Sequence, residues 1–218
     1  FYADDDDVKP LVPESFIARV FLSTSPIKLL KSFCFKGKKV LDVGCGNGRH
    51  SFFLSQLGFD VYGCEVDGVI AEKLNIKFST NNFFASYVDC IDSDDESYDY
   101  VVGANSIYYL DNEDSTIKSN LSELERVLTK RGCMVISFIG EEHFLLNKCK
   151  VLDDRTVIIQ KDPLEFRNDT RIRPAWGKDD IHSMFECFEK LSVYKICEIK
   201  DACAEFTRHI YYCVIYKD

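Results

Sequence analysis

The fold of this 218-residue chain is decided by the stretch Val40-Leu41-Asp42-Val43-Gly44-Cys45-Gly46-Asn47-Gly48. Its first four residues predict a buried strand, and the three alternating glycines let the backbone turn sharply into a helix. A dinucleotide-binding turn would read G-x-G-x-x-G/A, but the sixth position counted from Gly44 is Arg49. The turn therefore reads G-x-G-x-G behind an acid, which disfavours a nicotinamide cofactor.

The acid before the turn, Asp42, indicates the charge of the ligand. A carboxylate aimed at this turn would repel a pyrophosphate and attract a cofactor that carries an ammonium group beside a sulfonium. S-adenosylmethionine has both groups. A helix-capping role for Asp42 is the structural alternative.

Strand and helix patterns alternate around this turn. Strands are predicted at 40–43, 60–64, 84–88, 98–103 and 133–139, with helices at 48–57, 69–77 and 114–128. This order is typical of βαβ units around a parallel sheet. Two β-rich runs near the end, 191–199 and 206–216, have no helix between them and are expected to pair antiparallel. The prediction is a Rossmann-like, doubly wound α/β fold: a mostly parallel seven-stranded sheet with an antiparallel C-terminal strand and helices on both faces.

The ends of the chain and one interruption suggest how the domain is divided. Residues 1–37 are predicted to form an N-terminal helical cap, with helices opening at Pro13 and Pro26. Residues 38–218 are expected to form the main domain. The pattern loosens at about 140–176, where a short helix (143–149) and a strand (157–159) are predicted. This interruption follows the fifth strand and is expected to be a substrate-facing insertion.

The segment V-L-D-V-G-C-G-N-G-R resembles motif I of class I S-adenosylmethionine-dependent methyltransferases of the small-molecule type, and the resemblance continues at matching spacing over about residues 38–139. It implies that Glu65 holds the ribose hydroxyls, that Asp89 and the backbone of Cys90 contact the adenine, and that Asn105 lies at the methionine end of S-adenosylmethionine. The full set of implied cofactor contacts is Asp42, Gly44, Cys45, Gly46, Gly48, Glu65, Val66, Asp89, Cys90 and Asn105.

The catalytic residues are not identified by the sequence, although three side chains are candidates. His50 follows the glycine turn, and Tyr108 and Tyr109 follow the fourth strand. The alternatives are a helix-start contact for His50 and a core position for the tyrosines. Methyl transfer depends mainly on holding donor and acceptor in line, so a general base is required only if the acceptor proton must leave early.

The acceptor is predicted to be a small soluble molecule methylated on O or N. The net charge of −9 and the scattered basic residues disfavour nucleic acid, which selects for a clustered basic face. Residues 105–108 also lack the prolines of the (N/D/S)-P-P-(Y/F) motif that DNA amino-methyltransferases carry. Arg167, Arg171 and Arg173 suggest an anionic or sugar-type acceptor, unless they belong to a solvated loop. A methyltransferase for tRNA or protein, and a binding or scaffold protein without catalysis, remain as alternatives.

The ten cysteines point to a reducing compartment. None forms a C-x-x-C pair, and the four histidines do not cluster with them, so no metal site is predicted. Most lie in apolar runs, where a free thiol behaves as a small hydrophobe. A cytoplasmic protein is expected, with no signal peptide and no membrane-spanning segment.

Overall fold

The computed structural model describes residues 14–23, 35–153, 155–163, 165–186, 188, 190–199 and 207–217. The predicted helices at Pro13 and Pro26 therefore fall in part or entirely outside the described residues. Of the predicted cap, one helix is described, α1 (Ser15–Ser23).

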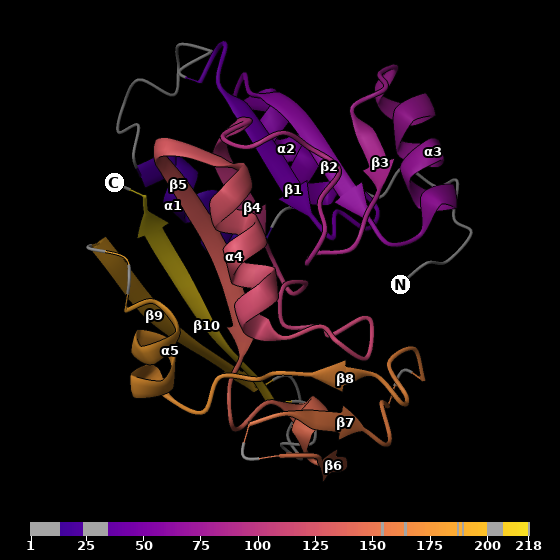
Figure 1. Cartoon of the computed structure of the whole chain (residues 1–218), viewed down its shortest axis with the longest axis vertical. Helices are drawn as coiled ribbons and strands as arrows, with labels where there is room; N and C mark the ends of the chain where they lie inside the picture. Colours follow the sequence, from indigo (N-terminus) through magenta and orange to yellow (C-terminus); the bar gives the residue numbers. More distant parts are fainter. Residues whose placement is uncertain are drawn as a thin grey trace.

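A seven-stranded sheet forms the centre of the molecule (Figure 1). The strands lie in the order β3-β2-β1-β4-β5-β10-β9. Strands β1 to β5 pair in parallel, whereas β10 is antiparallel to both of its neighbours. The predicted fold class is confirmed. The strand bounds are β1 (Lys39–Val43), β2 (Asp60–Glu65), β3 (Phe83–Ala85), β4 (Tyr98–Gly103), β5 (Leu128–Ile139), β9 (Lys190–Ile199) and β10 (Thr207–Tyr216).

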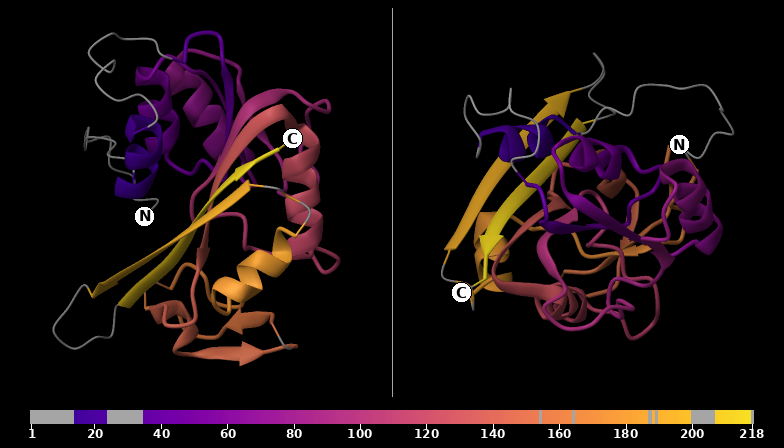
Figure 2. Two further views of the ribbon diagram at one scale, coloured as in Figure 1. Left: turned by 90° about the vertical axis from the view of Figure 1, so that its left-hand side faces the viewer. Right: turned by 90° about the horizontal axis from the view of Figure 1, so that it is seen from above.

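Helices cover both faces of the sheet (Figure 2). The first face carries α1, α2 (Arg49–Gln56) and α3 (Gly68–Phe78), and the opposite face carries α4 (Ile117–Val127) and α5 (Lys178–Met184). Successive strand residues point to opposite faces, so β1 contributes to both cores. Val40 packs with α1 and α2, while Leu41 packs with α4 and α5.

The interruption after β5 folds into a second, smaller antiparallel sheet of β6 (Cys149–Val151), β7 (Val157–Ile159) and β8 (Arg171–Ile172). Isolated bridges join it to the main domain, from Ile172 to Tyr109 and from Ala175 to Gly140. The small sheet consequently lies beyond the carboxyl ends of β4 and β5 (Figure 1).

Several element boundaries differ from the predicted ones for local reasons. Helix α4 begins at 117 rather than 114, because the Thr116 hydroxyl accepts a hydrogen bond from the Ser119 N–H in a capping box. Strand β3 ends at Ala85 rather than 88, because the Ser86 hydroxyl donates to the Cys90 carbonyl and closes a turn. The helix expected at 143–149 is a single 3₁₀ turn over Phe144–Leu146.

Candidate active site

The glycine turn joins β1 to α2 at the carboxyl edge of the sheet. Gly44, Gly46 and Gly48 have φ angles of 64°, 53° and 77°, in the left-handed region that side chains disfavour. A Cβ at Gly44 would lie 2.4 Å from the Cβ of Ser106. The N–H groups of Gly44 and Cys45 both donate to the carbonyl of Cys64. The turn is therefore tied to β2 and packed so closely against Ser106 that a side chain at Gly44 would not fit.

The carboxylate of Asp42 lies under this turn and is 1% exposed. It accepts a hydrogen bond of 2.6 Å from the Ser51 hydroxyl in the first turn of α2. Burial raises the pKa of Asp42 to about 7, against the lowering effect of the Ser51 hydrogen bonds. This contact with the first turn of α2 agrees with the structural alternative, a helix-capping role for Asp42. Because Asp42 is buried, its negative charge would act on a ligand at the turn electrostatically and not by direct contact.

The carboxylate of Glu65, at the end of β2, faces the same turn. One oxygen accepts from the Gly46 N–H at 2.9 Å and the other from the Val66 N–H at 3.0 Å. Each carboxylate oxygen has two lone pairs, so both oxygens retain the capacity to accept from a vicinal diol. Glu65 therefore fits the ribose-binding role that the resemblance implies.

The two residues implied to contact adenine lie beyond β3. Asp89 accepts hydrogen bonds from the Ser115 hydroxyl at 2.5 Å and the Asn112 side chain at 3.2 Å. Cys90 is exposed, and Val66 is 44% exposed. These side chains lie on the side of the edge formed by β2 and β3, away from Asn105.

Asn105 follows β4 in a left-handed conformation, with φ 58°. Its N–H donates to the Ser137 hydroxyl at 2.8 Å, and its side-chain amide donates to Glu14 Oε1 at 2.6 Å. Asparagine tolerates this conformation better than most residues. The side chain of Asn105 is thereby turned toward the N-terminal helix α1.

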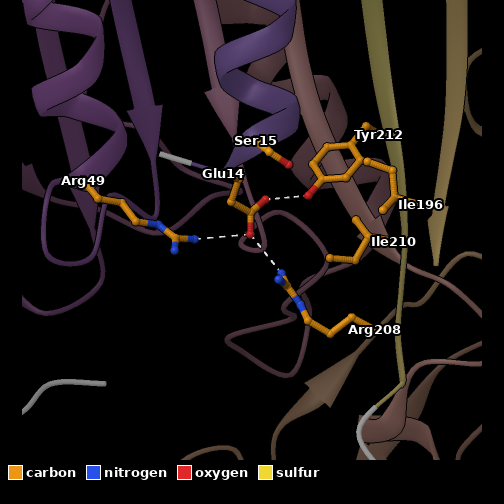
Figure 3. Close-up of a pocket in the computed structure, with 7 residues that line it drawn as sticks. All are labelled: Glu14, Ser15, Arg49, Ile196, Arg208, Ile210 and Tyr212. Atoms are coloured by element: carbon orange, nitrogen blue, oxygen red, sulfur yellow. Dashed lines mark hydrogen bonds and ion pairs between the residues drawn. The ribbon is translucent and has the colours of Figure 1, made fainter. Parts of the chain in front are cut away.

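Glu14 accepts hydrogen bonds from three parts of the chain, and Figure 3 shows those from Arg49, Arg208 and Tyr212. Oε1 accepts from Asn105, from Arg208 at 3.0 Å and from Arg49 at 3.3 Å, and Oε2 accepts from the Tyr212 hydroxyl at 2.6 Å. Burial would raise the pKa of Glu14, but the Tyr212 hydrogen bond and the two arginine charges outweigh it and lower the pKa. Glu14 is therefore an ionised, buried carboxylate at neutral pH.

The three candidate catalytic side chains are occupied in structural contacts. His50 Nε2 accepts the backbone N–H of Glu14 at 3.2 Å, and burial lowers the pKa of His50 to about 4. Burial raises the pKa of Tyr108 and of Tyr109, and the Tyr109 hydroxyl accepts from Arg167 at 3.0 Å. These geometries correspond to the alternatives stated above: a contact at the helix start and buried aromatics.

The three arginines of the insertion do not form a solvated loop. Arg173 is 5% exposed and makes two hydrogen bonds to Asp180, of 2.7 and 2.9 Å. Arg171 donates to the carbonyls of Asn112 and Glu113, and Arg167 binds Asp162 as well as Tyr109. All three hold the insertion together, so their charges are already paired or bound to backbone carbonyls.

Sequence reasoning missed the contribution of Arg49, Arg208 and Tyr212 to the edge of the sheet. Arg49 was visible only as the residue that breaks the dinucleotide fingerprint. Tyr212 meets Glu14 across a separation of 198 residues, which no local pattern reveals. The antiparallel pairing of the two C-terminal runs is the one signal that brings residues 208–212 to this edge.

A comparison with protein families gives the same result as the geometry. The family model described as "Methyltransferase domain" matches residues 40–132, from β1 through the glycine turn and Glu65 to the start of β5. The matched segment, which is less than half of the chain, is therefore similar to a methyltransferase domain. The turn, Glu65 and Asn105 lie where the resemblance places contacts to S-adenosylmethionine, and Glu65 offers acceptor oxygens that fit its ribose.

Relatives and solved structures with this domain differ in their acceptors. The chain is 27% identical over 61% of its length to a 23S rRNA (uracil-C5) methyltransferase of Pyrococcus horikoshii, and 38% identical over 34% to a probable S-adenosylmethionine-dependent methyltransferase, TehB, of Haemophilus influenzae. It covers only 32% and 27% of those proteins. A Burkholderia thailandensis 1,6-didemethyltoxoflavin N1-methyltransferase, solved with S-adenosylhomocysteine, has the same fold, with a TM-score of 0.59, 16% identity, and coverage of 84% of this chain and 72% of the other.

Proposed function

We propose that this protein transfers the methyl group of S-adenosylmethionine to an oxygen or nitrogen atom of a small soluble molecule. The observation that carries the proposal is the convergence of the glycine turn, Glu65 and Asn105 at one edge of the sheet, next to Glu14, the residue that precedes α1. The glycine turn places backbone without side chains at this edge, Glu65 supplies acceptors for a diol, and Asn105 donates to Glu14, which lines the adjoining cavity.

A small acceptor is supported by what covers this edge. Glu14, the residue before α1, donates its backbone N–H to His50, which follows the glycine turn. The β6–β8 sheet lies beyond β4 and β5. A cavity of about 140 Å³ lies beside Glu14, between the start of α1, the start of α2 and strands β9 and β10. A cavity of similar size holds a molecule such as benzene, so the opening suits a small group better than a flat macromolecular surface.

The protein's main chemical task is to position the methyl donor and the acceptor in line. When bound, S-adenosylmethionine supplies an electrophilic methyl group on a positively charged sulfur. The Asp42 carboxylate, close behind the turn, favours that positive charge. Burial raises the pKa of Tyr108 and of Tyr109, which favours the protonated hydroxyls, so these side chains could orient an acceptor but are poor bases. An acceptor nucleophilic at neutral pH, such as an amine, is consistent with this arrangement.

A cytoplasmic location is part of this proposal. The seven cysteines among the described residues are all free, and four of them are buried. Free thiols in this number are typical of reducing compartments. Within the described part of the chain, no helix is both long and apolar enough to span a bilayer.

RNA methylation is a second candidate, because a 23S rRNA methyltransferase is among the relatives. The charge of the chain opposes it: the net charge is −9, and RNA binding depends on Lys and Arg contacts to phosphates. The two candidates differ in which substrate accepts label from methyl-labelled S-adenosylmethionine.

Calorimetric titration with S-adenosylhomocysteine tests the cofactor site. We expect one-to-one binding that is weakened at least tenfold by Glu65→Gln and unchanged by Glu72→Gln, a matched change of an exposed acid on α3. Labelled methyl transfer is then compared between a panel of small amines and phenols and bulk tRNA and rRNA. Label in RNA alone contradicts the small-molecule proposal, and equal binding by the two variants contradicts the site.

A further inference from the structure

The segment 86–97 connects β3 to β4 without a helix or strand of its own. It carries Asp89 and Cys90, the two residues that the resemblance assigns to adenine. Val88 and Ile91, which flank this pair, are buried, so part of the connecting backbone is removed from water. Backbone N–H and C=O groups that leave water need hydrogen-bond partners, and a segment outside the sheet has to find them on a neighbouring element.

Helix α4 supplies these partners through two of its side chains. The Glu123 carboxylate accepts the N–H of Ile91 at 2.7 Å, and Nη2 of Arg126 donates to the Ile91 carbonyl at 3.0 Å. Nη1 of Arg126 donates to the carbonyl of Ser93 at 2.8 Å and to the Asp95 carboxylate at 2.7 Å. Both backbone polar groups of the buried Ile91 are therefore bound by side chains one turn apart on α4.

Glu123 and Arg126 also hold each other in place. Nε and Nη2 of Arg126 donate to the two oxygens of Glu123, at 2.9 and 2.7 Å, in a bidentate pair. These hydrogen bonds lower the pKa of Glu123 despite its burial, so the carboxylate is ionised at neutral pH. All three guanidinium nitrogens are engaged in this network. A lysine, which has a single nitrogen, cannot occupy these positions at once.

The Asp89 carboxylate is held from the residues that lead into the same helix. The Ser115 hydroxyl donates to it at 2.5 Å and the Asn112 amide at 3.2 Å, and both hydrogen bonds end on Oδ2. Within the described part of the chain, Oδ1 is thus left to accept from a ligand. An ionised carboxylate oxygen only accepts, so it suits the 6-amino group of adenine and repels a carbonyl oxygen at that position.

We propose that Arg126 is a positioning residue for adenine recognition: by fixing the backbone of residues 91–93 it holds Asp89 Oδ1 toward the 6-amino group of the cofactor. This inference rests on the proposed function and deepens it, because it assigns selectivity for adenine to a side chain that acts through Asp89. The Arg126 carbonyl accepts the N–H of Glu96 at 2.9 Å, a bond that a change of side chain leaves in place. Substitution therefore releases residues 91–93 and keeps the connection to the start of β4.

The test compares the binding of S-adenosylhomocysteine and S-inosylhomocysteine, in which a carbonyl oxygen replaces the 6-amino group. In calorimetric titrations, the wild-type protein should prefer S-adenosylhomocysteine by about tenfold or more, as expected for a hydrogen bond to a charged group. Arg126→Gln should reduce this preference by about threefold or more and leave the affinity for S-inosylhomocysteine nearly unchanged. Arg126→Lys should retain part of the preference. Lys118→Gln, a change of an exposed residue on the same helix, should leave it intact.

A merely structural role of Arg126 would weaken the binding of both ligands alike. Equal losses of the two affinities, or an unchanged preference in Arg126→Gln, would therefore overturn the proposal. If circular dichroism shows that this variant does not fold, the same two criteria apply to Arg126→Lys.

The variant Asp89→Ala tests the route through which Arg126 acts. It should lack the preference already, and adding Arg126→Gln to it should change the preference no further. A further change would mean that Arg126 acts by another route and would overturn the proposal. Equal binding of the two ligands by the wild-type protein would overturn it as well. Failure of the wild-type protein to bind either ligand is a separate result, which would refute the proposed function itself.

Discussion

The substitution Glu14→Ala removes the carboxylate on which α1, α2, β4 and β10 converge. The helix itself should persist, because Phe16, Ile17 and Phe21 stay packed in the core. What is lost is the set of hydrogen bonds from Asn105 and Tyr212 and the ion pairs with Arg49 and Arg208. We therefore expect a native fold with reduced stability and a loosened contact between α1 and the edge of the sheet.

The magnitude follows from the exposure of each donor. The Tyr212 hydroxyl makes a buried hydrogen bond, and leaving such a donor without its acceptor costs about 1–3 kcal/mol. The Asn105 amide is part-buried and adds about 1 kcal/mol on the same basis. The arginine side chains are 39% and 26% exposed, so solvent screens their pairing and they add at most about 1 kcal/mol together. The expected loss of unfolding free energy is about 3 kcal/mol.

Urea unfolding monitored by circular dichroism measures this loss, and Tyr212→Phe provides the matched partner for a double-mutant cycle. Phenylalanine keeps the ring stacked on Phe16, whose centroid lies 4.2 Å away, while it removes the hydroxyl. We expect the two changes to be coupled by about 1–2 kcal/mol. Purely additive effects, or a loss of unfolding free energy below about 0.5 kcal/mol in Glu14→Ala, would refute the interpretation of Glu14 as a buried, ionised carboxylate that binds these donors.

Three further changes test other parts of the site. Gly44→Ala should abolish binding of S-adenosylhomocysteine in calorimetry and destabilise the fold by more than about 2 kcal/mol, since the new Cβ would lie 2.4 Å from Ser106 Cβ at a φ of 64°; an unchanged affinity would contradict the turn geometry. Because burial raises the pKa of Asp42 to about 7, its negative charge appears as pH rises through 7. The affinity for S-adenosylmethionine should therefore rise about tenfold between pH 6 and pH 8, and Asp42→Asn should flatten this dependence; a profile unaffected by the substitution would count against an electrostatic role. Arg173→Ala should cost about 3–5 kcal/mol in urea unfolding, because it leaves the buried Asp180 carboxylate without its bidentate partner; a change within about 0.5 kcal/mol would mean that Asp180 is satisfied by its remaining donors.

Much of the central sheet was predictable because its signals are local. The β1 strand, the glycine turn and α2 are specified by consecutive residues, and the apolar residues of β4 identify it without any knowledge of its neighbours. Boundaries set by side-chain hydrogen bonds were less predictable. The start of α4 depends on the contact between Thr116 and Ser119, and the end of β3 depends on the Ser86 hydroxyl. The hydrophobic periodicity of the sequence does not reveal either of these side-chain contacts.

The candidate site likewise has some contacts that could be predicted from the sequence and others that could not. The contact of Glu65 with the glycine turn follows from motif and spacing, since adjacent parallel strands end at the same edge. The partners of the arginines in the insertion, such as Asp180 for Arg173, are chosen by tertiary packing and could not be predicted from the sequence. A role of these arginines toward an anionic acceptor stays a prediction. The contacts of Arg208 and Tyr212 with Glu14 could not be predicted either, because they depend on the pairing of β10 with β5.

The division between these two kinds of residue bears on acceptor choice. The segment that matches the methyltransferase domain, 40–132, contains the glycine turn, Glu65 and Asn105. Of the residues that line the cavity it contains only Arg49, and it lacks Glu14, Ser15, Ile196, Arg208, Ile210 and Tyr212. Relatives named for an rRNA acceptor and for a small-molecule acceptor share this fold or segment, so the shared part does not by itself select the acceptor. Under the proposed function, residues outside this segment are therefore expected to contribute to acceptor selection, and Glu14, Arg208 and Tyr212, which meet next to Asn105, are candidates for this role.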